Sequence, residues 1–268
     1  MSHSRASLRL IGVVHVRATP GAPRYGGSMV ELLDAARSDA AALAAGGCDA
    51  LIVENFGDVP FHAEHVPSET IAALALAVSA VRAGVGERFE IGVNVLRNDA
   101  RAALGLCAAT GAQFLRVNVH TGAAVTDQGL VQGRAAETLR ERARLCPRVA
   151  VWADVHVKHA SPLAHEKIEE CAADTVLRGL ADAVIVSGAA TGSAPEPARV
   201  AAVRSVLART PIYLGSGVNE SNAAALLAAA DGAIVGTALK HDGRVEEPVD
   251  VDRVKRLRRV FDALRPAR

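Results

Sequence analysis

Hydrophobic positions follow two alternating patterns along the chain, one typical of strands and one typical of helices. Short runs rich in Val, Ile and Leu are each followed by a turn of glycine or polar residues, and then by an Ala- and Leu-rich stretch with helical spacing. Eight such rounds occur without a long linker. The predicted strands are Leu8–Val16, Ala50–Asn55, Glu90–Leu96, Phe114–His120, Val149–Lys158, Asp182–Ser187, Pro211–Gly215 and Gly232–Val235. The predicted helices are Met29–Ala45, Ser68–Ala83, Asp99–Ala109, Gly133–Leu145, Ile168–Leu177, Pro197–Leu207, Glu220–Ala229 and Asp250–Leu264.

This order of elements predicts a parallel sheet, because a helical crossover returns the chain to the same end of the next strand. Eight strand–helix units in 268 residues fit a closed (β/α)8 barrel, the TIM barrel, which takes about 250 residues. An open doubly wound sheet is the alternative. That fold normally carries a glycine-rich dinucleotide turn after the first strand, and residues 17–23 form a proline-rich loop instead. We therefore expect residues 1–268 to form one α/β barrel domain.

Composition argues against several classes of function. Hydrophobic residues are 50% and charged residues 22% of the chain, which is typical of a soluble globular protein. A net charge of +1 and 3% aromatic residues give little attraction or stacking surface for nucleic acid. We expect no membrane span and no signal peptide, because no apolar run approaches about 20 residues. The four cysteines lack disulfide or zinc spacing, so we expect a cytoplasmic protein with reduced thiols.

Polar residues gather at the ends of five successive predicted strands, where a barrel places its catalytic groups. They are His15, Glu54, Asn55, Asn94, Arg116, Asn118, His120, Asp154, His156 and Lys158. Because side chains alternate along a strand, the polar residues of the fourth and fifth strands are expected to face the barrel mouth. A network of mutually satisfied buried groups is the simpler explanation. Ten such groups are costly to desolvate, however, so we favour retention for binding or catalysis.

Three kinds of chemistry are compatible with this set. We expect Glu54, Asp154, His156 and Lys158 to be catalytic, and His15, Asn55, Asn94, Arg116, Asn118 and His120 to bind or orient the substrate. In the first mechanism, Lys158 forms a Schiff base with a carbonyl, assisted by Asp154 or Glu54.

In the second mechanism, Asp154 and His156 bind a divalent metal ion together with His15, His120 or Glu54. In the third, Glu54 or Asp154 is a general base, a histidine is the acid, and Lys158 stabilises an oxyanion. The sequence leaves the three open, and a salt bridge between Lys158 and Asp154 is an equally possible structural role.

Glycine-rich turns follow the last three predicted strands. Glycine allows main-chain amides to approach an anion, and loops after strands seven and eight commonly bind phosphate in this fold. The simpler explanation is that these glycines only make tight turns. We expect a phosphate site made by Ser187, Gly188, Thr191, Gly192, Gly215, Ser216, Gly217, Gly236 and Thr237, with Lys240 as a counter-charge.

Long strings of the sequence also resemble one known family. They include residues 53–61 (VENFGDVPF), 92–99 (GVNVLRND), 116–120 (RVNVH), 154–160 (DVHVKHA) and 186–192 (VSGAATG). In these strings and in His15, residues 20–25 and residues 126–129, the chain resembles the BtpA/SgcQ family, named partly for a role in photosystem I biogenesis. The resemblance implies a TIM barrel of the ribulose-phosphate-binding type and a phosphosugar-like ligand, and it supplies no established reaction.

These observations lead to two hypotheses about function. The first is a cytoplasmic, self-associating enzyme that acts on a small phosphorylated sugar or nucleotide-like metabolite as a lyase, isomerase or hydrolase. The second is a non-enzymatic assembly or stability factor of a protein complex such as photosystem I. Its only support in the sequence is the basic C-terminal segment with Arg253, Lys255, Arg256, Arg258 and Arg259, which is more simply the solvated face of a last helix.

Overall fold

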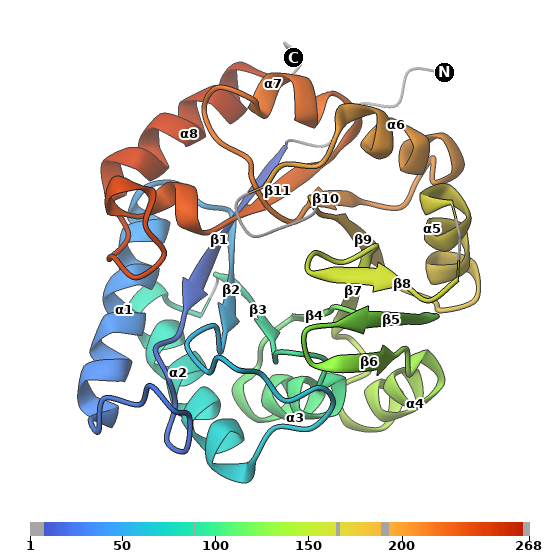
Figure 1. Ribbon diagram of the computed structural model, residues 1–268. Helices are drawn as coiled ribbons and strands as arrows, with labels where there is room; N and C mark the ends of the chain where they lie inside the picture. Colours follow the sequence, from blue (N-terminus) through green and yellow to red (C-terminus); the bar gives the residue numbers. More distant parts are fainter. Residues whose placement is uncertain (1–7, 88, 165–166, 189–192, 265–268) are drawn as a thin grey trace.

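Eight parallel strands close into a barrel in the computed structural model, which describes residues 8–87, 89–164, 167–188 and 193–264 (Figure 1). Around the ring the strands follow the order β1, β2, β3, β4, β7, β9, β10, β11 and back to β1. The strands are β1 Arg9–His15, β2 Ala50–Glu54, β3 Glu90–Asn94, β4 Phe114–Val117, β7 Ala150–Val155, β9 Ala183–Val186, β10 Ile212–Leu214 and β11 Gly232–Val235. The predicted TIM barrel is therefore confirmed.

Helices between the strands form the outer layer, as expected for right-handed crossovers. They are α1 Met29–Ala45, α2 Ser68–Val85, α3 Ala100–Thr110, α4 Ala135–Leu145, α5 Ile168–Leu177, α6 Pro197–Val206, α7 Ala223–Leu226 and α8 Val251–Ala263. N-terminal caps set the start of three helices. The side chains of Ser28, Asp99 and Asp250 cap α1, α3 and α8 by accepting hydrogen bonds from main-chain amides. The predicted helix at residues 220–229 is shorter, because α7 passes into a 3-10 turn at Leu227–Ala229.

A second, three-stranded antiparallel sheet lies next to the ends of β4 and β7 (Figure 1). Its strands are β5 Ala123–Thr126, β6 Gly129–Gln132 and β8 Ala160–Pro162, in the order β6-β5-β8. The sequence pattern did not predict this sheet, because residues 121–132 and 159–167 were assigned to loops between the predicted elements. The fourth and fifth barrel strands were also predicted too long, to His120 and Lys158. The chain instead leaves the barrel after Val117 and Val155, and His156 has a positive φ of 52° that ends the alternation.

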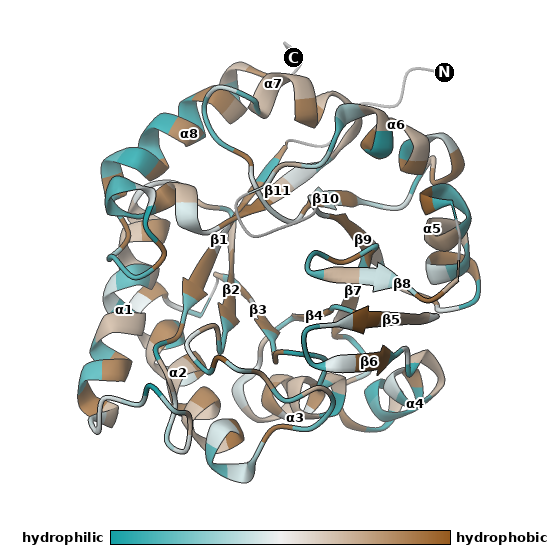
Figure 2. Cartoon of the chain, viewed as in Figure 1, coloured by the Kyte–Doolittle hydropathy of each residue, from teal (hydrophilic) through white to brown (hydrophobic). Residues whose placement is uncertain are grey.

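The barrel interior is apolar at its base and polar at its mouth. Hydropathy colouring shows the barrel strands as mostly hydrophobic, with the helices two-sided (Figure 2). Phe114, Trp152 and Tyr213 stack inside the barrel, with ring centroids 3.8 and 4.5 Å apart. Gly92 leaves room for this stack, since a Cβ atom there would lie 2.1 Å from the Phe114 ring. Two residues further along the strands, the inward positions become polar, which is the alternation that the sequence predicted.

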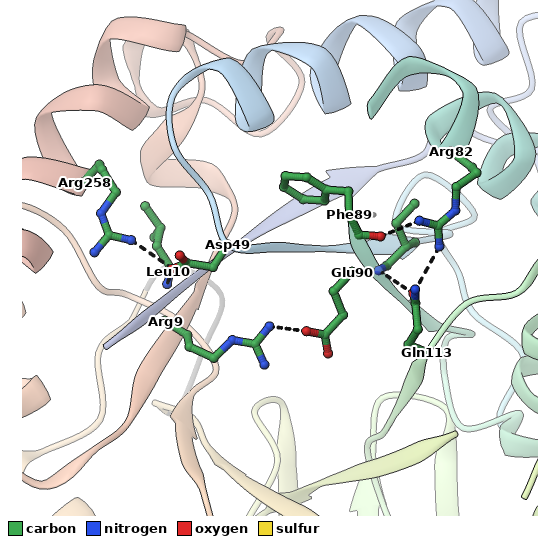
Figure 3. A network of polar contacts seen from close by, with 9 residues as sticks. Arg9, Leu10, Asp49, Arg82, Phe89, Glu90, Gln113 and Arg258 are labelled. Atoms are coloured by element: carbon green, nitrogen blue, oxygen red, sulfur yellow. Dashed lines mark hydrogen bonds and ion pairs between the residues drawn. The ribbon is translucent and has the colours of Figure 1, made fainter. Parts of the chain in front are cut away.

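Charge pairs close the opposite, N-terminal end of the barrel (Figure 3). Arg9 on β1 pairs with Glu90 on β3, and Arg82 on α2 donates to the main-chain carbonyl of Phe89 and, at 3.1 Å, to Gln113. Similar pairs join Asp49 to Arg258 at 2.9 Å, and Arg204 to Asp231. The side chains that Figure 3 shows here therefore satisfy one another.

One helix of the described residues, α2, is long and apolar enough to cross a membrane by length and composition alone. Here it packs in the outer layer between α1 and α3, and it buries Leu74, Val78 and Val81. We therefore treat α2 as a core helix.

Cys48 and Cys107 are buried, and burial raises the pKa of the Cys48 thiol to about 12. Little of the reactive thiolate is present at such a pKa, so we treat Cys48 as unreactive.

Candidate active site

A cavity of about 250 Å³ occupies the mouth of the barrel at the C-terminal ends of the strands. Val13 and Ile234 are among its apolar lining residues. Its ionisable side chains come from four elements or loops around the ring: His15, Glu54, Arg116 and Lys158. The rest of the wall is mainly the two glycine-containing segments at residues 215–219 and 234–238. Two of the four predicted catalytic residues therefore meet in one cavity, together with predicted binding residues.

Asp154 anchors the site from beneath. Its two carboxylate oxygens accept from Nε and Nη2 of Arg116 at 2.8 and 2.9 Å, and also from Asn118 at 3.1 Å and Ser187 at 3.2 Å. All four residues are buried. Because these donors occupy both oxygens, Asp154 holds Arg116 in place instead of pairing with Lys158. The Lys158–Asp154 salt bridge considered from the sequence is not formed.

Glu54 ends β2 and reaches the cavity with a side chain that is almost fully buried. Asn94, one strand along, donates its amide to one carboxylate oxygen. The main chains of these two residues are register partners between β2 and β3, which explains why their side chains meet. Asn94 therefore positions Glu54 and does not itself line the cavity.

Lys158 reaches the cavity from the loop after β7, not from the strand itself. Its main-chain carbonyl accepts a 2.6 Å hydrogen bond from the buried Arg97, which lies in the loop after β3. Burial lowers the pKa of the Lys158 ammonium, and the positive charges of Arg116 and Arg97 act in the same direction against the opposing effect of Glu54. A larger fraction of Lys158 is therefore a neutral, nucleophilic amine than for a solvated lysine.

His15 is held as a neutral imidazole. Its ring packs against Phe56, with centroids 4.5 Å apart, and against Gly236, where a Cβ atom would lie 2.5 Å from the ring. Burial, followed by the charges of Lys240, Lys158 and Arg116, lowers the pKa of His15 to about 3. Nδ1 is buried and has no hydrogen-bond partner within the residues that the structure describes. His15 thus keeps polar capacity for a ligand at the cavity edge.

The predicted phosphate-binding residues fall into three groups. Gly215, Ser216, Gly217, Gly236 and Thr237 all line the cavity. Ser187 and Gly188 lie behind it, where Ser187 donates to Asp154 and the Gly188 amide donates to Ser216 Oγ at 3.3 Å. Thr191 and Gly192 lie outside the described residues.

The loop after β10 needs glycine for close packing. Gly217 has a φ of 72°, and a Cβ atom there would lie 2.2 Å from the main-chain nitrogen of Ala194. Within the part of the chain that the structure describes, no acceptor is found for the amides of Ser216, Gly217 and Val218. The wall of the cavity thus offers main-chain donors.

The mouth cavity also lacks four further predicted site residues: Asn55, Lys240, His120 and His156. Asn55 does not line the cavity, since its amide group bonds Asp58 and both the amide and the carbonyl of Leu96, which ties two loops together. Lys240 does not line the mouth cavity, and its ammonium donates to the buried Asp39 at 3.0 Å and to the Glu247 carbonyl at 2.8 Å.

The expected inward orientation is wrong for His120 and His156, since both lie beyond the points where their strands end. His120 is buried and contacts the carbonyl of Gly179 at 2.8 Å. His156 lies 3.4 Å from Arg199 and lines a separate cavity of about 40 Å³.

The donor set does not fit the metal-binding mechanism. Arg116, Asn118 and Ser187 occupy the oxygens of Asp154, and His156 and His120 point elsewhere. In residues 8–87, 89–164, 167–188 and 193–264, no three His, Cys, Asp or Glu side chains converge on a common point. We therefore derive no step through a metal ion.

Two contributors to the site were missed in the sequence analysis. Phe56 follows Glu54 by two residues and lines the cavity, and Arg97 fixes the main chain at Lys158. Both belong to the strings that carried the family resemblance, so a signal was present. Arg97 was missed because it lies beyond the predicted strand, and its contact depends on a loop that is 61 residues away.

Residues 7–263 match the BtpA family. The photosystem I biogenesis protein BtpA of Synechocystis is 44% identical over 245 residues, which is 91% of this chain and 85% of the relative. An uncharacterised protein of Thermococcus kodakarensis is 44% identical over 256 residues, which is 96% of both chains. Both matches extend over more than nine-tenths of this chain.

Solved structures share the fold at low identity. The native KDPGal structure superimposes with a TM-score of 0.61, at 17% identity over 98% of both chains. The (S)-3-O-geranylgeranylglyceryl phosphate synthase of Thermoplasma acidophilum, in complex with sn-glycerol-1-phosphate, has a TM-score of 0.58 at 15% identity, covering 97% of this chain and 95% of that one. These likenesses support the barrel alone. The sequence match across the chain shows that this protein belongs to the BtpA family.

Proposed function

We propose that this protein is an enzyme that binds a phosphorylated small molecule in the barrel mouth and acts on its carbonyl group through Lys158 and Glu54. The observation that carries the proposal is that these two side chains line one cavity of about 250 Å³ with the glycine loops after β10 and β11. Reactive groups and main-chain donors thus border the same space. Such convergence of polar groups in a concave site is typical of ligand-binding centres.

The phosphate end of the ligand would lie against Gly217, Gly236 and Thr237. Loops after the last two barrel strands are the common phosphate site of this fold, and the enzyme from Thermoplasma with the same fold binds sn-glycerol-1-phosphate. Arg116 adds a positive charge: Asp154 uses its Nε and Nη2, which leaves Nη1 for the ligand. The amides of Ser216 and Val218 complete the set of donors.

At the other end of the ligand, neutral Lys158 would attack the carbonyl carbon. The new C–N bond forms as the carbonyl oxygen leaves as water, and one proton taken up from the solvent gives a protonated imine. This cation accepts the electron pair of a neighbouring C–H or C–C bond when that bond breaks, and Glu54 takes or returns the proton. Hydrolysis of the imine restores Lys158. This chemistry favours a lyase or isomerase over a hydrolase.

Borohydride trapping tests the covalent step. Wild type incubated with ribulose 5-phosphate, ribose 5-phosphate or dihydroxyacetone phosphate and then reduced should gain the mass of a reduced adduct on the peptide that contains Lys158. Lys158→Met and Lys158→Arg should give no adduct, while Glu54→Gln still traps. If Lys158→Met still converts one of these sugar phosphates to product, the Schiff-base mechanism is overturned and non-covalent acid–base catalysis is favoured. The same sugars without phosphate are the control for the glycine loops.

The alternative of an assembly factor has less support in the fold. The basic residues of α8 mostly pair within the chain: Arg256 with Glu220 at 3.1 Å, Arg258 with Asp49 at 2.9 Å, and Lys255 with Asp252 at 3.6 Å. They are therefore accounted for without a partner protein. Self-association remains a prediction that sedimentation of the purified protein would test.

A further inference from the structure

A second, larger space adjoins the mouth cavity. It is a groove of about 770 Å³ between α1, the loop after β1 and residues 245–248 of the loop before α8. The mouth cavity, at about 250 Å³, lies below the ~300–1,000 Å³ that small-molecule sites usually span. A phosphorylated sugar would occupy most of the mouth, so any larger ligand must extend into a neighbouring space. This groove is a direct continuation.

Two aromatic rings stand at the junction. His15 and Phe56 line both the mouth cavity and the groove, and their rings contact each other. Tyr25 lines the groove beyond them. The chain has only 8 residues of Phe, Trp and Tyr, and several of these, such as Phe114 and Trp152, are buried in the core. Half-buried Phe56 and Tyr25 are thus two of the few aromatic surfaces left for a ligand.

The wall of the groove is preformed. Asp39 on α1 accepts from Lys240 at 3.0 Å and from the Val249 amide at 2.8 Å, and Lys240 also donates to the Glu247 carbonyl. These buried contacts fix the loop before α8 against α1. Asp39 and Lys240 also balance each other's charge. Because the loop is already fixed, little conformational entropy is lost when a ligand binds.

The lining of the groove combines apolar side chains with polar groups at its edge. Val16, Ala18 and Leu32 are among the apolar lining residues. Besides the paired Asp39 and Lys240, the charged lining residues are Arg17, Arg24, Glu31, Asp34, Glu246 and Glu247. Apolar surface with aromatic rings and a few polar groups at the edge is typical of a site for a planar ring system. We propose that the groove binds a planar heteroaromatic group of a substrate whose sugar phosphate lies in the mouth. This inference rests on the proposed function, and it specifies the substrate class as a nucleotide-like compound whose sugar phosphate is in the open-chain form that carries the carbonyl.

Titration calorimetry with AMP, GMP, CMP, UMP, adenosine and ribose 5-phosphate tests the groove. At least one nucleotide should bind wild type about tenfold more tightly than ribose 5-phosphate, a gain of about 1.4 kcal/mol. Tyr25→Ala should remove part of this gain. Ala35→Trp, which fills the groove from α1, should remove all of it and leave ribose 5-phosphate binding within about twofold of wild type. Leu76→Trp, an equally bulky change on the exposed side of α2, should behave as wild type.

The outcomes separate the groove from the mouth. If none of the four nucleotides binds more tightly than ribose 5-phosphate, or if Ala35→Trp leaves the gain unchanged, the groove proposal is wrong and the mouth proposal stands. If adenosine binds in a way that Ala35→Trp abolishes while ribose 5-phosphate binds no variant, the groove stands and the phosphate site in the mouth is overturned.

Discussion

The two ends of the barrel use charged residues in opposite ways. At the N-terminal end, Arg9 pairs with Glu90, and Arg204 with Asp231. At the C-terminal mouth, Glu54 and Lys158 line a cavity, and within the described residues neither forms an ion pair. Charges at the first end satisfy one another. At the second end Arg116 pairs with Asp154, whereas the Glu54 carboxylate is held by the neutral amide of Asn94. Because desolvating a charge is costly, the mouth gives up stability that ligand binding would recover.

The strongest test of this contrast replaces Glu54. Glu54→Gln keeps the size of the side chain and can still accept from Asn94. We expect turnover to fall by about 10²–10⁴-fold, the usual contribution of a general acid–base group. The melting temperature should stay the same or rise, because a buried charge is lost. Steady-state kinetics and thermal unfolding measure both effects, and activity within threefold of wild type would remove Glu54 from the mechanism.

Arg116 should show the largest effect on stability. Arg116→Met leaves the Asp154 carboxylate buried without its charged partner, and removal of one member of a buried pair costs about 3–5 kcal/mol. Denaturant unfolding measures this loss. The double variant with Asp154→Asn should recover part of it, since the uncompensated charge is then absent. A double variant no more stable than Arg116→Met would show that packing, not charge, dominates here.

His15 gives the mouth a pH signature. Its pKa of about 3 lies below the value of about 6.5 expected in the unfolded chain, so the unfolded state binds a proton first as the pH falls. Stability is therefore retained above pH 6.5, and is lost on acidification by up to about 1.4 kcal/mol per pH unit for this group. His15→Gln should flatten the curve of unfolding free energy between pH 6.5 and 4. Equal slopes in the two proteins would show that His15 titrates normally.

The barrel and the inward-facing residues within the C-terminal parts of its strands could be predicted from local pattern. Glu54, Arg116 and Asp154 follow the two-residue alternation of their strands, so their common end of the barrel was predictable. The prediction failed where the backbone leaves that pattern. His156 has a left-handed conformation, and His120 lies three residues past the end of β4.

Contacts between residues far apart in the chain could not be predicted from the sequence. Lys240 pairs with Asp39, which is 201 positions away, and no local spacing reports such a partner. The small sheet was more accessible: Thr126-Asp127-Gln128-Gly129 is a turn signal between two short apolar runs, and Gly129 has a φ of 91° there. These residues could therefore have been predicted as a hairpin between the fourth barrel strand and the helix that follows.

The smallest expected effect comes from repeating the Glu-to-Gln change at the other end of the barrel. Glu90 pairs with Arg9, and their side chains are 35% and 27% exposed, so water screens the pair. Glu90→Gln should lower the unfolding free energy by less than about 1 kcal/mol, and this loss should shrink further at high salt. Ribose 5-phosphate binding and turnover should match wild type, because the base of the barrel lies between Glu90 and the mouth. A loss of turnover comparable to that of Glu54→Gln would contradict the division of the barrel into a stabilising end and a reactive one.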